Sequence, residues 1–491
     1  MTEETVKVLV VYTGGTIGMT PADPNNPASP LRPAGKEELA DYVPNPAEGI
    51  HWDIEGLYDR DGNPVGPVDS SAVGPTHWRY MADLIATRYE DYDGFVVLHG
   101  TDTMAYTGSA LPFLLQNLGK PVVVTGSQLP VFKARTDAVV NFINALHIAG
   151  YKAVNVPLIP EVSIAFGDKL FRGCRTTKVS TTDWQGFESP NYPHLASFGE
   201  HILVNRKAVA PPPESGEQFF AHKDLDEKVM NFSLYPGMQP EPVKSILGLE
   251  DVEGYVLQTF GTGNAPPDEE FVEALGEAVR DKNVVVNVTQ CLKGKVEMGL
   301  YEASSGLQEA GVISGLDMTA EAALAKLMWL KTQEVDPNEI LVQFQVNQRG
   351  EQSQNLFDVR YESKSRKNKP VETETLSARP AGQFRKDALE RAILRLSGLG
   401  LTGTDEGEDV AVGVFVNLIK ADQSTETDKP QFAGYLTGQY EGEGTVLTGD
   451  ITQTVRRVHE EGRPINLTLV APEGKKLWLR GAFLSLFTDV E

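Results

Sequence analysis

The stretch that most constrains the fold is Val6–Gly18, VKVLVVYTGGTIG, in which an apolar run leads directly into two glycines. A nearly continuous apolar run is typical of a strand that is covered on both faces, as in a parallel sheet. Gly14 and Gly15 allow a sharp turn and a close approach of the backbone to a ligand. Thr13 and Thr16 then lie beyond the carboxyl end of the strand, where open α/β sheets bind ligands. The stretch predicts an α/β fold, although an ordinary strand-to-helix turn explains it equally well.

A second stretch repeats this arrangement and adds a carboxylate. The apolar run Phe95–Leu98 is followed at once by His99, Gly100, Thr101, Asp102 and Thr103 in the sequence FVVLHGTDTM. Ligand sites of parallel sheets form at the carboxyl ends of the strands. We therefore expect the hydroxyls and the carboxylate of the two stretches to meet in one crevice.

The pair TGGTIG and HGTDTM closely resembles the L-asparaginase family, in which a threonine is the nucleophile. The continuation LHGTDTMAYTGSAL and the later RGCRTTK resemble the cytoplasmic bacterial type I branch. The resemblance extends from Val6 to Glu351. It implies an α/β fold with two Rossmann-like parallel-sheet domains of the asparaginase type. It also implies hydrolysis of L-asparagine to L-aspartate and ammonia through a threonine acyl-enzyme.

The resemblance further implies a catalytic set of Thr16, Thr101, Asp102 and Lys178. Thr16 is the expected nucleophile, and the other three form a second cluster with Lys178 as the candidate base. An amine must lose its proton to act as a base, and burial promotes this loss. By residue type alone, Lys178 is a surface cation, because most lysines are exposed. Which cluster activates Thr16 and which activates water stays open.

Asp69, Ser70 and Ser71 are the expected substrate-binding residues, together with Thr101 and Asp102. A carboxylate can accept hydrogen bonds from the ammonium group of an amino acid, and a serine can donate to its carboxylate. The same triplet is commonly a helix cap or a turn. The resemblance favours binding of the amino-acid end of the substrate.

The proline-rich segment Thr20–Lys36 is predicted to be an extended loop next to the nucleophile, where it would exclude water. The family usually places a tyrosine in this loop, and its hydroxyl assists the nucleophile. Alignment of Pro33–Gly35 with the family loop puts Leu31 at that position. The proton acceptor for Thr16 is therefore assigned to no residue of the loop.

We expect an N-terminal asparaginase domain over 1–195, a linker over 196–240 and a second α/β domain over 241–351. In the second domain, Gly261–Asn264 resembles the family loop that completes the active site of a neighbouring subunit. This makes Asn264 a further site candidate and implies a homodimer or homotetramer, although a tight turn also explains the glycines. Gln258 stands where some relatives have an arginine, which leaves regulation by asparagine open. Thr319 is expected to cap a helix over 320–330.

The resemblance ends near Gln352, and the rest of the chain is predicted to be appended. Residues 352–383 are expected to be a linker, and 384–491 a small β-rich domain of unknown role. An amphipathic helix is predicted over 384–396. Apolar alternation then predicts strands over 410–418, 465–470 and 477–487.

Composition limits the function further. The 491-residue chain has a formal net charge of −24, which disfavours binding to nucleic acid or to anionic membrane surfaces. Its two cysteines, Cys174 and Cys291, cannot form a disulfide framework and indicate a reducing compartment. The acidic N-terminus and the lack of a long apolar run predict a cytoplasmic protein that crosses no membrane. No metal-ligand spacing is present, so we expect neither metal nor cofactor.

Three alternatives stay open on the sequence alone. A glutaminase-asparaginase differs only by one methylene in the substrate. A tRNA-dependent amidotransferase subunit shares this core but needs a surface for RNA. A non-enzymatic ligand-binding module could use TGGTIG as a phosphate cradle, but the motif lacks the Gly-Lys-Ser/Thr ending of a P-loop.

Overall fold

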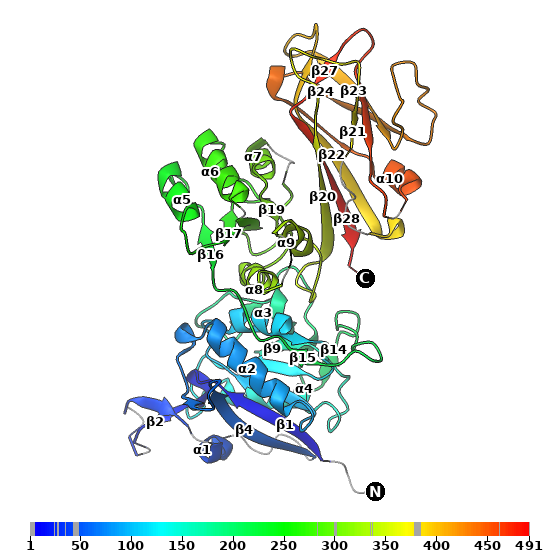
Figure 1. Cartoon of the computed structure of the whole chain (residues 1–491). Helices are drawn as coiled ribbons and strands as arrows, with labels where there is room; N and C mark the ends of the chain where they lie inside the picture. The colour runs from blue at the N-terminus through cyan, green and yellow to red at the C-terminus, as the bar shows by residue number, and fades with distance from the viewer. Residues whose placement is uncertain are drawn as a thin grey trace. The chain divides into compact units, whose positions relative to one another are not determined.

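The computed structural model describes residues 5–490 except 24, 27, 28, 35, 43–48, 282, 299–301, 334, 336, 378–383 and 461. The chain divides into two compact units (Figure 1). The first unit consists of residues 1–297, 306–340 and 348–352, and the second of residues 298–305, 341–347 and 353–491. Each unit is described by itself.

The first unit contains a nine-stranded sheet whose centre is parallel. Strand β1 (Val6–Tyr12) lies between β4 and β6 and pairs in parallel with both, and Val8 and Leu9, on its two faces, are fully buried. The predicted strand covered on both faces is therefore confirmed. In sheet order the strands are β14 (Ile202–Val204), β13 (Ala196–Phe198), β10 (Lys169–Arg172), β9 (Val162–Phe166), β8 (Val122–Thr125), β6 (Gly94–Leu98), β1, β4 (Ile50–Tyr58) and β5 (Pro64–Val65).

Helices cover both faces of this sheet. Phe142 and Leu146 of α4 pack in one core cluster with Val10 and Val96 of the sheet. Because side chains alternate along a strand, Leu9 points to the opposite face, and α2 and α3 pack on strands β4 and β9. The helices are α1 (Lys36–Tyr42), α2 (Pro75–Arg88), α3 (Met104–Leu114) and α4 (Ala138–Ala149).

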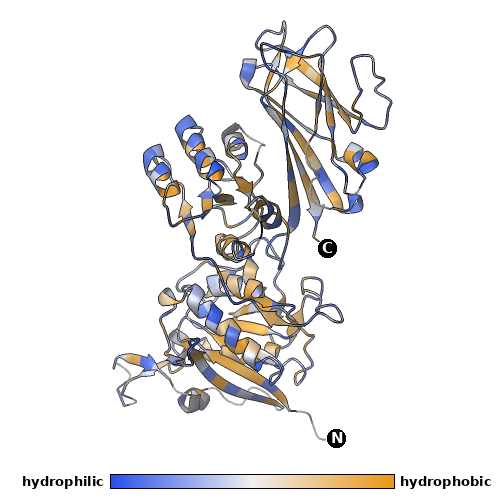
Figure 2. Ribbon diagram, viewed as in Figure 1, coloured by the Kyte–Doolittle hydropathy of each residue, from blue (hydrophilic) through white to orange (hydrophobic). Residues whose placement is uncertain are grey.

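A second sheet in the first unit has four strands that pair in parallel, which confirms the second parallel-sheet domain that the resemblance implied. Polar and apolar residues both occur along α5 and α6 beside it (Figure 2). Thr319 caps α8 as expected, because its hydroxyl accepts a hydrogen bond from the Ala322 amide at 3.1 Å. The strands are β16 (Val229–Ser233), β17 (Gly254–Thr259), β18 (Val284–Thr289) and β19 (Ile313–Ser314), and the helices of this part of the chain are α5 (Pro240–Leu247), α6 (Glu269–Arg280), α7 (Glu302–Ala310), α8 (Ala320–Leu330) and α9 (Pro337–Phe344).

The segment 196–240, predicted to be a linker, instead contributes strands to both sheets. β13 and β14 extend one edge of the nine-stranded sheet, and β16 is an edge of the second sheet. Strand β15 (Phe220–Ala221) pairs with β7 (Leu115–Gln116). Edge strands tolerate proline and polar residues, which made this segment resemble a loop in the sequence.

The second unit is a sandwich of two antiparallel sheets, which confirms the predicted β-rich domain. One core cluster joins both sheets, with Leu394 and Leu484 from one and Val412 and Leu469 from the other. The first sheet contains β20 (Gln354–Glu362), β28 (Gly481–Asp489), β22 (Leu389–Leu401), β25 (Thr445–Asp450) and β27 (Leu477–Trp478). The second sheet contains β21 (Thr373–Leu376), β26 (Leu467–Val470), β23 (Asp409–Val416) and β24 (Phe432–Gln439), and α10 spans Thr452–Val458.

Two predictions for this part of the chain are wrong. The helix expected over 384–396 is a short turn at Lys386–Ala388 followed by β22, which pairs with β25 and β28. Pairing on both sides outweighs the helical spacing of its apolar residues. The expected linker 352–383 contains β20 and β21, while 378–383 lie outside the described residues.

Among the described residues, no helix has the length and apolar character needed to cross a bilayer. The same part of the chain holds no group of three or more His, Cys, Asp or Glu side chains arranged to bind a metal ion. Both cysteines are free thiols.

Candidate active site

The glycine turns after β1 and β6 are in backbone contact. Gly15 has a φ of 85°, and a Cβ placed on it would lie 2.3 Å from the Gly100 amide nitrogen. Only glycine fits such an approach in this region of φ. Thr16 and Thr101 follow these two glycines, so the contact brings the two threonine-bearing turns together at the carboxyl edge of the sheet.

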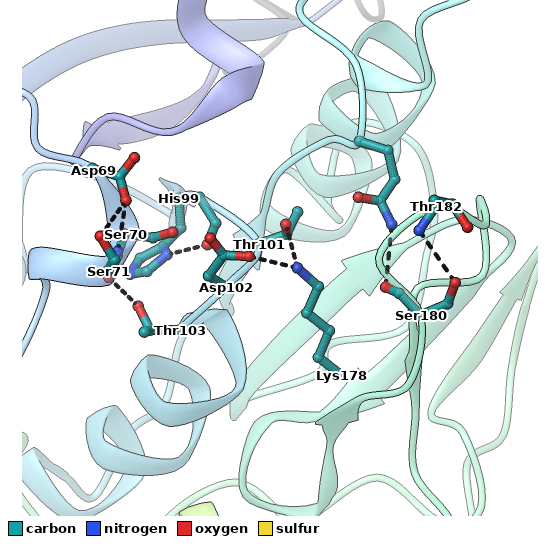
Figure 3. Close-up of polar contacts among 12 residues, drawn as sticks. Asp69, Ser70, Ser71, His99, Thr101, Asp102, Thr103, Lys178, Ser180 and Thr182 are labelled. Atoms are coloured by element: carbon teal, nitrogen blue, oxygen red, sulfur yellow. Dashed lines mark hydrogen bonds and ion pairs between the residues drawn. The ribbon is translucent and has the colours of Figure 1, made fainter.

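Lys178 meets two residues of the β6 turn. Its Nζ donates to Thr101 Oγ1 at 2.9 Å and forms an ion pair with Asp102 Oδ1 at 2.7 Å (Figure 3). The lysine side chain is 17% exposed and the Asp102 side chain 67% exposed. The structure therefore brings together three of the four predicted catalytic residues.

Thr16 begins a single 3₁₀ turn, Thr16–Gly18, and is half-buried. Its hydroxyl forms no hydrogen bond with another residue of the described ranges, Lys178 and Thr101 included. The turn is held from beneath by Tyr12, whose hydroxyl donates to the Gly18 carbonyl at 3.0 Å. Burial raises the pKa of Tyr12 to about 12, so this hydroxyl stays protonated at neutral pH.

The segment predicted to be an extended loop over the nucleophile contains a short hairpin. Strand β2 (Met19–Pro21) pairs with β3 (Leu31–Pro33), and the Ala34 amide donates to the Gly18 carbonyl at 2.7 Å. Leu31, at the position where the family usually has a tyrosine, is 46% exposed. Residues 24, 27, 28 and 35 of this segment lie outside the described residues.

The Asp69 turn shows the capping role that the sequence allowed, and its role in substrate binding stays a prediction. The Asp69 carboxylate caps the turn Ser70–Ala72 by accepting from the Ser71 amide at 2.8 Å and the Ser71 hydroxyl at 2.6 Å. These hydrogen bonds lower the pKa of Asp69. The Thr103 hydroxyl donates to the Ser70 carbonyl at 2.6 Å, which ties this turn to the Thr101–Thr103 loop (Figure 3). Ser70 is buried, while Asp69 and Ser71 are exposed.

A buried histidine beneath the site was not predicted from the sequence. His99 Nδ1 lies 2.7 Å from the Gly100 carbonyl, and Nε2 lies 2.8 Å from Thr107 Oγ1, which also accepts from Trp78 Nε1 at 2.9 Å. A carbonyl only accepts, so the proton is assigned to Nδ1, and the Thr107 hydroxyl donates to Nε2. Burial lowers the pKa of His99 to about 4, which keeps the ring neutral.

This network fixes the peptide between Gly100 and Thr101. In a trans peptide the carbonyl and the N–H point in opposite directions, so the Thr101 N–H points away from His99. It donates to no other residue in the described part of the chain. Thr101 is 9% exposed, so this donor is free in a nearly buried position.

The candidates from the second sheet are not joined to this cluster. The backbone N–H of Asn264 donates to the Phe260 carbonyl at 2.8 Å. The side chain of Gln258 donates through Nε2 to Asn231 Oδ1 at 2.9 Å. Within the described residues, no hydrogen bond links Asn264 to Lys178 or Thr101. The role expected for Asn264 is in the site of a neighbouring subunit, and it stays a prediction.

Comparison with known proteins identifies the family. The family model "Asparaginase, N-terminal" matches residues 7–210, and the model "Glutaminase/Asparaginase C-terminal domain" matches residues 228–344. L-asparaginase 1 of Escherichia coli (strain K12) is 41% identical over 345 residues, which cover 70% of this chain and 97% of the relative. The chain belongs to the asparaginase family.

Solved structures agree with this assignment of the asparaginase fold. The crystal structure of L-asparaginase I from Vibrio cholerae O1 biovar eltor str. N16961 matches with a TM-score of 0.61 at 38% identity. The match covers 71% of this chain and 99% of that one. A further family relative, the L-asparaginase of Thermococcus kodakarensis, is 35% identical over 333 residues, which cover 66% of this chain and 92% of the relative. The family models end at residue 344, before the β-sandwich of the second unit.

Proposed function

We propose that this member of the asparaginase family hydrolyses L-asparagine to L-aspartate and ammonia through an acyl-threonine intermediate. The observation that carries the proposal is the contact of Lys178 Nζ with Thr101 Oγ1 and Asp102 Oδ1, at 2.9 and 2.7 Å. An amine, a hydroxyl and a carboxylate in hydrogen-bond contact are the groups that a proton relay for amide hydrolysis requires.

In the first half of the reaction, Thr16 Oγ1 attacks the side-chain amide carbon of asparagine. The C–N bond breaks, the amide nitrogen takes up a proton and leaves as ammonia, and a β-aspartyl ester of Thr16 forms. In the second half, water attacks the ester carbon and the Thr16 oxygen leaves with a proton. The backbone contact of Gly15 with Gly100 supports this role, because it brings Thr16 to the turn that carries Thr101.

Lys178, Thr101 and Asp102 act as the proton relay. A neutral Lys178 receives a proton through the Thr101 hydroxyl, and the Asp102 carboxylate stabilises the ammonium group that results. Asp102 also has the exposure to meet the ammonium group of the substrate. Leu31, at the loop position where the family usually has a tyrosine, has no hydroxyl and supplies no proton acceptor to Thr16.

The remaining groups bind the substrate and stabilise the negative charge that develops on its amide oxygen. The free Thr101 N–H is the proposed donor to the oxyanion, and preorganised donors of this kind often contribute most to the rate of acyl transfer. Asp69, Ser70 and Ser71 are the proposed site for the amino-acid end, because a carboxylate and two hydroxyls complement an ammonium and a carboxylate. The hydrogen bond from the Thr103 hydroxyl to the Ser70 carbonyl connects the loop that carries Thr101 to the turn that carries Asp69.

Ammonia release from asparagine tests the proposal. Thr16→Val keeps the shape of the side chain and removes the nucleophile, so kcat is expected to fall by about 10³-fold or more. Thr332→Val is the matched control, because the Thr332 hydroxyl donates to the Trp329 carbonyl at 2.7 Å, at the end of α8. A Thr16→Val enzyme with the wild-type rate would remove Thr16 as the nucleophile.

The same assay, run with glutamine, addresses the alternative of a glutaminase-asparaginase. One extra methylene typically changes kcat/KM by about 10 to 200-fold, so we expect asparagine to be favoured within this range. A role as a tRNA-dependent amidotransferase subunit is less favoured, because a net charge of −24 opposes binding of tRNA.

We also propose that the enzyme is a cytoplasmic homodimer or homotetramer. Free cysteines, one of them exposed, favour a reducing compartment. The likeness of Gly261–Asn264 to a loop that completes a neighbouring site favours assembly. Light scattering of the purified protein is expected to give two or four chains, and a monomer at micromolar concentration would contradict the assembly.

A further inference from the structure

Lys178 lies on a strand too short to position it alone. Strand β11 contains only Thr177 and Lys178, and it pairs with Phe187 and Glu188 of β12. Successive side chains of a strand point to opposite faces. Lys178 points to Thr101, so Thr177 points away from the proposed proton relay.

Thr177 has a specific partner on that opposite face. Its hydroxyl donates to Glu321 Oε1 at 2.7 Å. Glu321 lies in the first turn of α8, which is capped by Thr319, and a carboxylate is favoured at this end of a helix. Glu321 is half-buried, and burial raises the pKa of its carboxyl. The hydrogen bond thus joins β11 to a rigid, capped helix of the second sheet.

A second anchor lies two residues earlier in the chain. The Arg175 guanidinium, with a side chain only 1% exposed, forms a two-pronged contact with Asp317 at 2.7 and 3.2 Å. It also donates to the Asn191 carbonyl at 2.9 Å and to the Glu351 carbonyl at 2.6 Å. Planar, bidentate contacts of this kind fix orientation as well as distance.

The contacts of Thr177 and Arg175 are both made with one short segment of the chain. Asp317 precedes the Thr319 cap of α8, and Glu321 lies in the first turn of that helix. These two carboxylates hold Arg175 and Thr177, which flank Thr176. The Thr176 hydroxyl donates back to the Arg172 carbonyl at 2.6 Å, so the intervening residue is fixed locally. The residues just before Lys178 are therefore anchored to 317–321, a segment far along the chain from the lysine itself.

We propose that Thr177 and Glu321 are positioning residues for Lys178: their hydrogen bond holds β11 so that Nζ stays within reach of Thr101 Oγ1. This inference rests on the proposed role of Lys178 in proton transfer. Neither residue touches the proposed reacting atoms. The expected consequence of losing the bond is a slower chemical step with substrate binding retained, because small misplacements of a catalytic group cost rate more than affinity.

Four variants of the full-length enzyme test the inference by asparagine hydrolysis. Thr177→Val removes the hydroxyl at constant shape and is expected to lower kcat by about 10 to 100-fold, with KM within about twofold of wild type. Thr177→Ser keeps the hydroxyl and is expected to restore kcat. Glu321→Ala is expected to match Thr177→Val, whereas Glu321→Gln keeps an acceptor oxygen and is expected to stay near wild type.

Two outcomes would overturn the positioning role: wild-type kcat in Thr177→Val, or a Thr177→Ser enzyme as slow as Thr177→Val. Thermal unfolding of each variant shows whether a slow variant is still folded, so that a displaced Lys178 is distinguished from an unfolded protein. Lys178→Met, measured beside them, reports on the proposed function by itself. If it turns over at the wild-type rate, the role of Lys178 is refuted, whatever the Thr177 variants show.

Discussion

At the scale of single residues, the Lys178–Asp102 pair is explained better by chemistry than by stability. The Asp102 side chain is 67% exposed, and ion pairs with such an exposed partner contribute less than about 1 kcal/mol to the free energy of unfolding. The lysine is nevertheless held at hydrogen-bond distance from two oxygens. Two such contacts of one lysine, with little benefit to folding, favour a role of the pair in chemistry.

Lys178→Met tests this interpretation. Loss of the amine is expected to lower kcat for asparagine by about 10³-fold while KM changes only a few-fold, because the amine serves the transition state. Lys228→Met is the control, since Lys228 is a 51% exposed lysine paired with Glu253 at 2.8 Å. Equal kcat values for the two variants would make Lys178 a structural cation.

His99 predicts a specific dependence of stability on pH. Its folded pKa of about 4 lies below the ordinary value of 6.5, because burial disfavours the charged ring. The unfolded chain binds a proton that the folded chain excludes, so stability is complete above pH 6.5 and is lost as the pH falls toward 4. The loss from this group alone is on the order of 3 kcal/mol.

Denaturation of the wild type and of His99→Gln at several pH values measures the effect. The glutamine variant lacks the titrating ring, so the gap between the two denaturation midpoints is expected to narrow from about pH 7 to about pH 4. A gap that does not change with pH would show that the pKa of His99 is the same in the folded and unfolded chain, which contradicts the prediction.

The sequence predicted the residues of the relay but not those that hold them. Lys178 and Thr101 lie in recognisable motifs, and the structure brings them into contact. The contacts of Thr107 with His99 and Trp78 depend on how α2 and α3 pack, and the contact of Thr177 with Glu321 joins residues 144 positions apart. No local pattern specifies such partners.

At the scale of secondary-structure elements, two strand ends and their glycine turns build the site. β1 and β6 are neighbours in register, and each is fully buried along its central residues, which fixes where their turns begin. Gly15 and Gly100 then pack backbone against backbone. The site depends on the absence of side chains at these two positions.

Gly15→Ala is the matching test. The added methyl group would overlap the backbone of Gly100 and would occupy a φ of 85°, so the Thr16 turn must shift. A shift of this size is expected to lower kcat by about 10²-fold or more. Gly66→Ala is the control, because a Cβ at Gly66 meets nothing within 4 Å. An active Gly15→Ala enzyme would contradict the proposed place of Thr16.

The type of an element, helix or strand, was predictable where the spacing of apolar residues in the sequence matched the faces that are buried in the structure. The buried run of β1 and the capped helix α8 follow the sequence rules directly. The stretch around Leu389, Ala392, Ile393 and Leu396 has helical spacing but forms β22, because β25 and β28 supply hydrogen bonds on both sides. Strands that form mainly because neighbouring strands pair with them are the hardest to recognise from their own sequence.

At the scale of the whole molecule, the end of the first unit is bound to both of its sheets. The Glu351 carbonyl accepts from Arg175, next to the first sheet, and the Glu351 carboxylate pairs with Lys326 of α8 at 2.5 Å. Both side chains of that pair are fully buried. The Cys174 thiol donates to the Arg349 carbonyl at 3.4 Å. Segment 348–352 thus links the two parallel-sheet regions.

Lys326→Met tests this link. The variant leaves the Glu351 carboxylate buried without its partner, which typically costs about 3–5 kcal/mol of stability. The double variant Lys326→Met/Glu351→Gln removes the unpaired charge and is expected to recover a large part of the loss. Thermal unfolding measures both, and an unchanged midpoint for Lys326→Met would contradict the account of this segment.

The central claim is that Thr16 attacks the substrate while Thr101 relays protons. Rapid acid quenching during turnover of asparagine, followed by digestion and mass spectrometry of the peptides, tests it most directly. The account predicts an aspartyl ester on the peptide that contains Thr16. An ester on the peptide that contains Thr101 would contradict it.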